Sequence, residues 1–110
     1  MALIFPIFVS AQDLAGTVSS TTGITVKIFS PIVIANNEYG YPQMFALTQN
    51  FPSGVIALRG VAGCHQGFGE IGFYNRETQK AIGEPVKWVR NGDKLSDAIA
   101  EVICGYRGKN

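Results

Sequence analysis

The chain has 110 residues, of which 46% are hydrophobic, and nine lysines and arginines against eight aspartates and glutamates leave a net charge of +1. This length suits one domain with a packed core and excludes two domains or an intrinsically disordered chain. The near-neutral balance also disfavours nucleic-acid binding, because a basic excess usually supplies most of the affinity for phosphates.

The N-terminus begins with an apolar run, Ala2 to Val9, which ends in the small-x-small triplet Val9-Ser10-Ala11. This pattern is typical of a secretory signal peptide, and the run is too short to span a bilayer. We therefore expect residues 1–11 to be a signal-peptide remnant that is cleaved before Gln12, and residues 12–110 to form a single domain. The alternative is a buried first strand, since these residues also favour strands.

The middle of the chain alternates apolar and polar residues in short runs, as half-buried strands do. Such runs cover residues 24–29 and 32–35, with Pro31 between them, and then residues 43–48, 55–62, 66–74 and 86–90. Turn-forming residues separate them at 36–40, 50–54 and 76–79. Strands spaced about ten residues apart predict an antiparallel meander sheet of about five to six strands.

The end of the chain changes to a helical period. Asp93 is suited to an N-cap and Gly105 to a helix stop. Between them one apolar stripe is formed by Leu95, Ala98, Ile99, Val102 and Ile103, which leaves Lys94, Asp97 and Glu101 outside it. Because the stripe must be buried on the sheet, the predicted fold class is α+β, with one C-terminal helix packed on the meander.

Cys64 and Cys104 are the only cysteines in the chain. In an oxidising compartment an even count predicts a disulfide, which here would close a loop of about 40 residues and tie the sheet to the end of the helix. The alternative is two reduced core cysteines in a cytosolic protein. On a helical wheel Cys104 points away from the apolar stripe, so the bridge requires a loosened last turn or a helix end that overhangs the sheet.

No catalytic, metal or cofactor site is expected. His65 follows Cys64 directly, and adjacent residues on a strand point to opposite faces, which argues against a metal site and against a Cys–His pair. The glycines at 60, 63, 67, 69 and 72 are not followed by Gly-Lys-Ser/Thr, so they do not form a phosphate-binding loop. They are more typical of bulges or close sheet packing.

The stretch Gln66 to Phe73 is similar to the RNA-contacting octapeptide of RRM domains, with Ile71 in place of valine. Phe68 is suited to stack on a base, but Gln66 replaces the basic first residue and Glu70 places a carboxylate where phosphates approach. RNA binding is therefore kept as a third hypothesis, and the expected partners do not include nucleic acid.

A second likeness extends from about Gly54 to Tyr106. It rests on Cys64, Tyr74, Trp88-Val89 and the run Leu95-x-x-Ala98-x-x-x-Val102-Ile103-Cys104-Gly105. In these residues the chain resembles the surface-adhesin protein E family of Gram-negative bacteria. The resemblance implies an antiparallel sheet with a C-terminal helix pinned by a disulfide, and a non-enzymatic envelope protein. The founding member is lipid-anchored and binds host matrix and plasma proteins; no lipobox cysteine occurs near Ala11-Gln12, which favours a soluble periplasmic or released protein.

We therefore expect a secreted or periplasmic binding protein without catalysis, whose partner is another protein, with a homodimer as a further possibility. A small periplasmic enzyme inhibitor or immunity-type protein is the alternative, since compact disulfide-tied sheets also block active sites. The predicted binding surface is a set of aromatic side chains that are free of a core role, namely Tyr39, Tyr41, Phe68 and Tyr74. The competing interpretation places Phe68 and Tyr74 under the helix.

Overall fold

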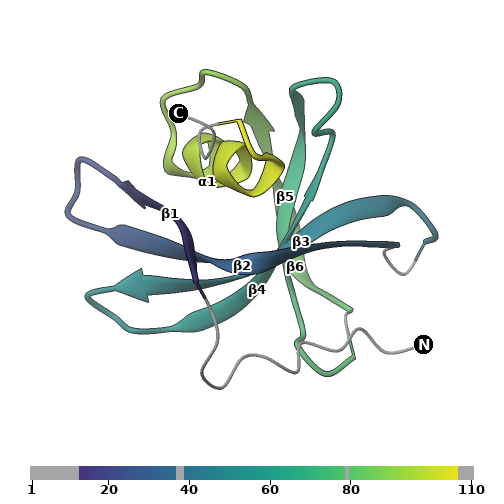
Figure 1. Cartoon of the computed structure of the whole chain (residues 1–110), viewed down its shortest axis with the longest axis horizontal. Coiled ribbons are helices and arrows are strands. Elements are labelled where there is room, and N and C mark those ends of the chain that lie inside the picture. Colours follow the sequence, from purple (N-terminus) through teal and green to yellow (C-terminus); the bar gives the residue numbers. More distant parts are fainter. Residues whose placement is uncertain (1–12, 37–38, 79, 107–110) are drawn as a thin grey trace.

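The computed structural model of the chain describes residues 13–36, 39–78 and 80–106, which form a six-stranded antiparallel sheet and one helix (Figure 1). The elements are β1 (Leu14–Ser19), β2 (Thr25–Asn36), β3 (Pro42–Phe51), β4 (Ile56–Ala62), β5 (Phe68–Tyr74), β6 (Ala81–Val89) and α1 (Leu95–Cys104). The strands are ordered in space as they are in sequence, so the predicted α+β meander with a C-terminal helix is confirmed. The proposed signal peptide, residues 1–11, lies outside the described residues.

The two edge strands differ most from the prediction. β1 was not predicted, because it has Gly16 at its centre and Val18 as its one fully buried side chain. β6 begins five positions earlier than expected, at Ala81 instead of Val86. Residues 81–87 are all exposed at the edge of the sheet, and Gly83 and Pro85 within them resemble a turn.

Pro31 bends β2 instead of ending it. The pairing of β2 with β3 shifts register between Phe29 and Val33, and regular pairing continues on both sides of the shift. A proline cannot donate to the ladder, so it is accommodated at an irregularity of this kind. The two short strands predicted around it are therefore one strand.

Helix α1 lies against one face of the sheet, between β1 and β5 in the view of Figure 1. Its buried side chains Ile99, Ala100, Val102 and Ile103 pack with a cluster from the strands, formed by Val18, Val26, Ile28, Ala46, Val61, Ile71 and Trp88. The predicted apolar stripe thus faces the sheet. A Cβ atom at Gly16 would lie 2.6 Å from Cγ1 of Val102, so glycine at this position lets β1 approach the helix.

The turn into α1 is fixed by two buried carboxylates, and here the prediction was wrong. Asp97 and Glu101 were expected on the solvent side of the helix but are 3% and 2% exposed. Asp97 accepts hydrogen bonds from the backbone N–H of Val89 (2.9 Å) and of Lys94 (3.0 Å), and Glu101 accepts one from the backbone N–H of Asn91 (2.9 Å). Lys94, and not Asp93, occupies the N-cap position.

A second apolar cluster lies on the opposite face of the sheet. Phe45 and Leu47 alternate with the helix-facing Ala46 along β3, and they pack with Leu58 and Tyr74. All four side chains are buried. Both faces of the central strands are therefore covered in the described structure.

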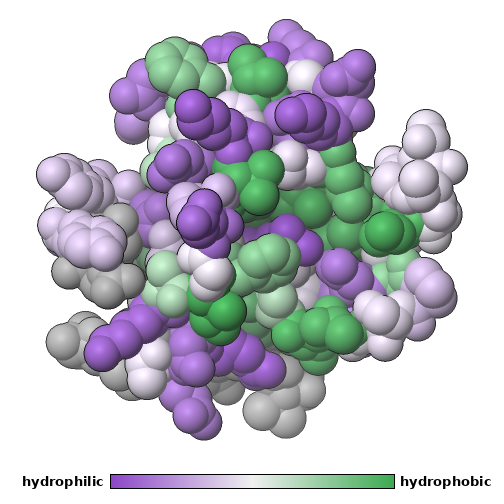
Figure 2. All heavy atoms as spheres, turned by 180° about the vertical axis from the view of Figure 1, so that it is seen from behind, coloured by the Kyte–Doolittle hydropathy of each residue, from purple (hydrophilic) through white to green (hydrophobic). Residues whose placement is uncertain are grey.

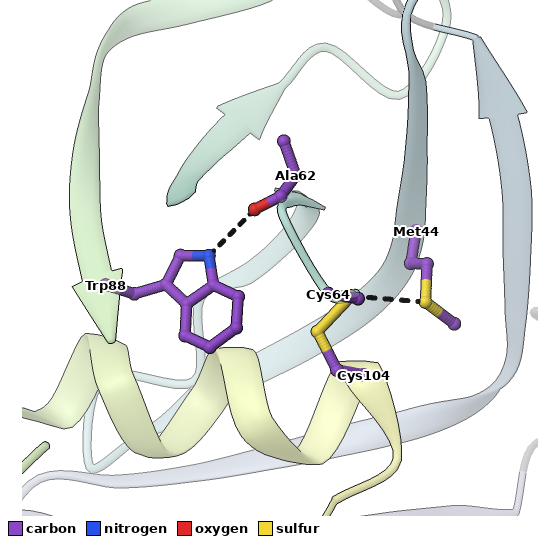
Figure 3. The surroundings of a disulfide bond; sticks show 5 residues. All are labelled: Met44, Ala62, Cys64, Trp88 and Cys104. Atoms are coloured by element: carbon purple, nitrogen blue, oxygen red, sulfur yellow. Dashed lines mark hydrogen bonds between the residues drawn. A yellow bond between two sulfur atoms is a disulfide. The ribbon is translucent and has the colours of Figure 1, made fainter. Parts of the chain in front are cut away.

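The predicted disulfide between Cys64 and Cys104 is present, with a Cα–Cα distance of 5.4 Å (Figure 3). Cys64 lies in the turn after β4 and Cys104 is the last residue of α1, so the bond ties the end of the helix to the sheet as predicted. Gly105 follows in the left-handed conformation, with φ of 91°, and ends the helix as predicted.

Two neighbours enclose this bridge (Figure 3). The indole N–H of Trp88 donates to the carbonyl oxygen of Ala62 at 2.9 Å, which joins β6 to the end of β4. The sulfur of Met44 lies 3.3 Å from Sγ of Cys64. This is a contact between sulfur atoms and not a hydrogen bond, because a disulfide sulfur carries no proton.

Candidate functional site

The predicted aromatic surface is only partly exposed. Tyr39, Tyr41 and Phe68 are 76%, 67% and 61% exposed, but Tyr74 is 8% exposed. The ring of Tyr74 packs edge-on against Phe45, with centroids 5.1 Å apart, and its hydroxyl donates to Oε1 of Gln43 at 2.8 Å. The expectation that Tyr74 belongs to a binding surface was therefore wrong, and so was the competing view that Phe68 lies under the helix.

The remaining aromatic residues lie at one end of the sheet. Tyr39 and Tyr41 are in the connection between β2 and β3, and Phe68 begins β5, where it pairs with the exposed Val89 of β6. Tyr74 ends β5 at the opposite end of the sheet. The structure thus separates the four residues that the sequence grouped together.

A cleft lies at the end of the sheet where β5 ends at Tyr74, between the start of β4 and the β5–β6 turn. We call it the β4–β6 cleft; its volume is about 760 Å³. Four side chains in its lining are apolar and exposed to water: Val55 (59%), Ile56 (48%), Phe73 (40%) and Ile82 (54%). Apolar side chains that stay exposed together in one hollow favour a binding surface, because burying them against a partner releases water from apolar area.

The cleft arises because β4 and β5 are offset along the sheet. β5 pairs with β4 from Leu58↔Tyr74 to Ala62↔Glu70, so the chain before Leu58 extends beyond the end of β5. After Tyr74 the chain turns toward β6, where Phe73 pairs with Ile82. The space that a longer β5 would fill is left open.

The rim of the cleft is polar and held in shape by its own turn. Oδ1 of Asn75 accepts hydrogen bonds from the backbone N–H groups of Glu77 (2.8 Å) and Thr78 (2.9 Å). An Asn side chain that bonds to the backbone two and three residues later stabilises a turn. Arg76 and Glu77 complete the rim, so an apolar floor is bordered by charges of both signs.

Arg59 does not line the cleft, but it contacts one of the residues that do. It is 8% exposed, and its guanidinium lies 4.4 Å from the ring centroid of Phe73, a lining residue of the cleft. Its Nε–H donates to Oγ1 of Thr48 at 3.0 Å, and Nη2 donates to Oδ1 of Asn50 at 3.4 Å. The cross-strand pairs Ala46↔Arg59 and Arg59↔Phe73 place it on the helix-facing side of the sheet.

Burial lowers the pKa of Arg59 from its ordinary value to about 10, because desolvation disfavours the charged form. The guanidinium still carries its proton at neutral pH. The shift corresponds to about 3 kcal/mol of unfavourable desolvation at that pH. The sequence offered one signal for this residue, which is that Arg59 is the single charge in the apolar run 55–62.

Figure 2 views the molecule from behind and shows hydrophobic side chains that reach the surface together, bordered by hydrophilic ones. The described residues that line the β4–β6 cleft include no histidine, cysteine or serine. Among the described residues, no group of three or more His, Cys, Asp or Glu is placed to hold a metal ion.

Comparison with protein-family models, with curated proteins and with solved structures finds no match to this chain. The described residues contain no helix with the length and apolar character that crossing a membrane requires.

Proposed function

We propose that this chain is an exported, non-enzymatic protein-binding module of the surface-adhesin E type, and that the β4–β6 cleft is its binding site. The observation that carries the proposal is the cleft itself, whose lining includes four exposed apolar side chains, those of Val55, Ile56, Phe73 and Ile82. The disulfide between Cys64 and Cys104 supports export, because such bonds persist in oxidising compartments.

The second candidate is a periplasmic enzyme inhibitor or immunity-type protein. The residues just before β3 favour it, because Tyr39 and Tyr41 are exposed there at one end of a disulfide-tied sheet. Exposed aromatic side chains at such a position are suited to fill a partner's pocket. The two candidate functions place the binding site at opposite ends of the sheet. The end that a bound partner covers therefore distinguishes them.

Ile56→Lys is expected to weaken partner binding at least about tenfold, since it places a charge among apolar side chains that a partner would bury. The immobilised full chain would be incubated with host serum and matrix proteins and, separately, with periplasmic extract. A protein captured by the parent chain would then be titrated against each variant to obtain its dissociation constant.

Ile34→Lys is the matched control, because Ile34 is 69% exposed on β2 and lies outside the cleft. This substitution changes the net charge by the same amount as Ile56→Lys. Its binding should equal that of the parent chain. Equal binding by Ile56→Lys and Ile34→Lys would contradict the cleft as the site. Loss of a periplasmic enzyme on Tyr39→Ser, with Ile56→Lys unaffected, would favour the inhibitor.

Export predicts a mature chain that begins at Gln12. Intact-mass measurement of the protein from its native host, without reducing agent, should give the mass of residues 12–110 less two hydrogens for the disulfide. A cytosolic protein that retains residues 1–11 would contradict the proposed localisation.

A further inference from the structure

The turn between β6 and α1 contains the pair Asn91-Gly92, and the fold constrains both positions. Asn91 has a φ of 64°, and among the described residues it is the one residue other than glycine with a positive φ. Asparagine is one of the few residues that adopt this left-handed conformation readily. A Cβ atom at Gly92 would overlap Oδ2 of Asp97, so glycine is what lets the turn pass over this buried carboxylate.

An asparagine that precedes a glycine can lose ammonia without a catalyst. The backbone nitrogen of the glycine attacks the side-chain carbonyl carbon of the asparagine, and a five-membered succinimide ring closes. The amide group leaves as ammonia and takes the proton of the attacking N–H with it. Water then opens the ring at one of its two carbonyl groups, which leaves aspartate or isoaspartate. Glycine favours the attack, because no Cβ atom crowds its nitrogen.

We infer that Asn91 is a deamidation site, and that its conversion loosens the connection between β6 and α1. Asn91 is exposed and lies outside the strand and the helix, so water reaches its side chain. The attacking nitrogen, that of Gly92, donates a hydrogen bond to the carbonyl oxygen of Val89 at 3.1 Å. This bond is lost when the turn opens, and the nitrogen is then free to attack.

Two other asparagines in the described structure are suited to serve as internal references. Asn50 precedes Phe51 and Asn75 precedes Arg76, so a large side chain follows each of them. Asn50 also lies within β3, where the ladder holds its backbone. The side-chain oxygen of Asn75 accepts two backbone hydrogen bonds of its own turn, which fix the side chain away from the attack. Both should react more slowly than Asn91.

Both products disturb the turn. Each adds a negative charge to a turn that already lies over the buried carboxylates of Asp97 and Glu101, the second of which accepts from the backbone N–H of Asn91 at 2.9 Å. Like charges this close repel each other. Isoaspartate also routes the main chain through its side chain, which lengthens the link to Gly92 by one atom. The hydrogen bond from Gly92 to Val89 spans this link and cannot keep its geometry.

The test is incubation of the full chain in mildly alkaline buffer, where the attacking nitrogen loses its proton more easily. Samples taken over time are digested at acid pH, and the peptides are separated and weighed by mass spectrometry. We expect the peptide with Asn91 to deamidate several-fold faster than those with Asn50 or Asn75, and to split into an aspartyl and an isoaspartyl form. Urea should unfold the converted chain at a lower concentration than the fresh chain.

Asn91→Gly is the matched control, because glycine also adopts a positive φ and has no side-chain amide to lose. After the same incubation it should unfold at the same urea concentration as before. Asn91→Asp adds the charge without the longer main chain, so it should unfold between the fresh and the converted parent chain. Asp97→Ala should deamidate faster at Asn91 than the parent does, because the turn opens more often without its acceptor.

Two results would overturn the inference. The first is deamidation at Asn50 or Asn75 that matches or exceeds the rate at Asn91, which would mean that the β6–α1 turn protects its asparagine. The second is an Asn91 that has been fully converted while the chain still unfolds at the urea concentration of the fresh sample. That result would show that the connection between β6 and α1 tolerates both products.

Discussion

Replacing both Cys64 and Cys104 with alanine is expected to lower the free energy of unfolding by about 2–4 kcal/mol without changing the fold. The bond joins residues 40 positions apart, so it removes much of the freedom of the unfolded chain. It also holds the end of α1, a helix of 10 residues, and helices this short are marginal in water without docking.

Urea unfolding of the parent chain and the double variant, followed by circular dichroism, would measure the difference. The parent chain with its bond reduced should unfold at the same urea concentration as the double variant, which controls for the altered side chains. Unfolding free energies that agree within about 0.5 kcal/mol would show that packing alone secures the helix end.

The sequence predicted those parts of the fold that depend on repeated patterns. The helix carries one apolar stripe, which must be buried against another apolar surface, and the preceding strands supply that surface. The stripe is formed by Leu95, Ala98, Ile99, Val102 and Ile103. The pairing of Cys64 with Cys104 followed from their even number. β1 and the first half of β6 were missed, because edge strands bury few side chains and so carry a weak alternation.

The candidate site was predicted less well, because alternation assigns a side chain to a face but does not say what covers that face. Phe68 and Tyr74 do share a face of β5. However, Phe68 lies at its open end, whereas Tyr74 meets Phe45 and Leu58 across the neighbouring strands. The β4–β6 cleft could not be predicted either, since it depends on where β5 stops relative to β4.

Buried polar groups were the second class of error, and Asp97 shows the physical reason. A helical wheel places Asp97 and Glu101 outside the apolar stripe, where solvent is expected. The chain must also turn sharply between β6 and α1, and the turn leaves backbone N–H groups that need acceptors. These two carboxylates supply the acceptors and are buried beneath an exposed turn.

Asp97→Ala is therefore expected to lower the free energy of unfolding by about 2–4 kcal/mol, because it removes a buried carboxylate and leaves the part-buried backbone N–H groups of Val89 and Lys94 without their acceptor. Asp93→Ala, an exposed neighbour with the same change of charge, should alter stability by less than about 0.5 kcal/mol. Denaturant unfolding of both variants would give the two values. Hydrogen exchange should in addition show faster exchange at Val89 and Lys94 in Asp97→Ala alone. Equal stabilities of the two variants would mean that the carboxylate of Asp97 does not hold the β6–α1 turn.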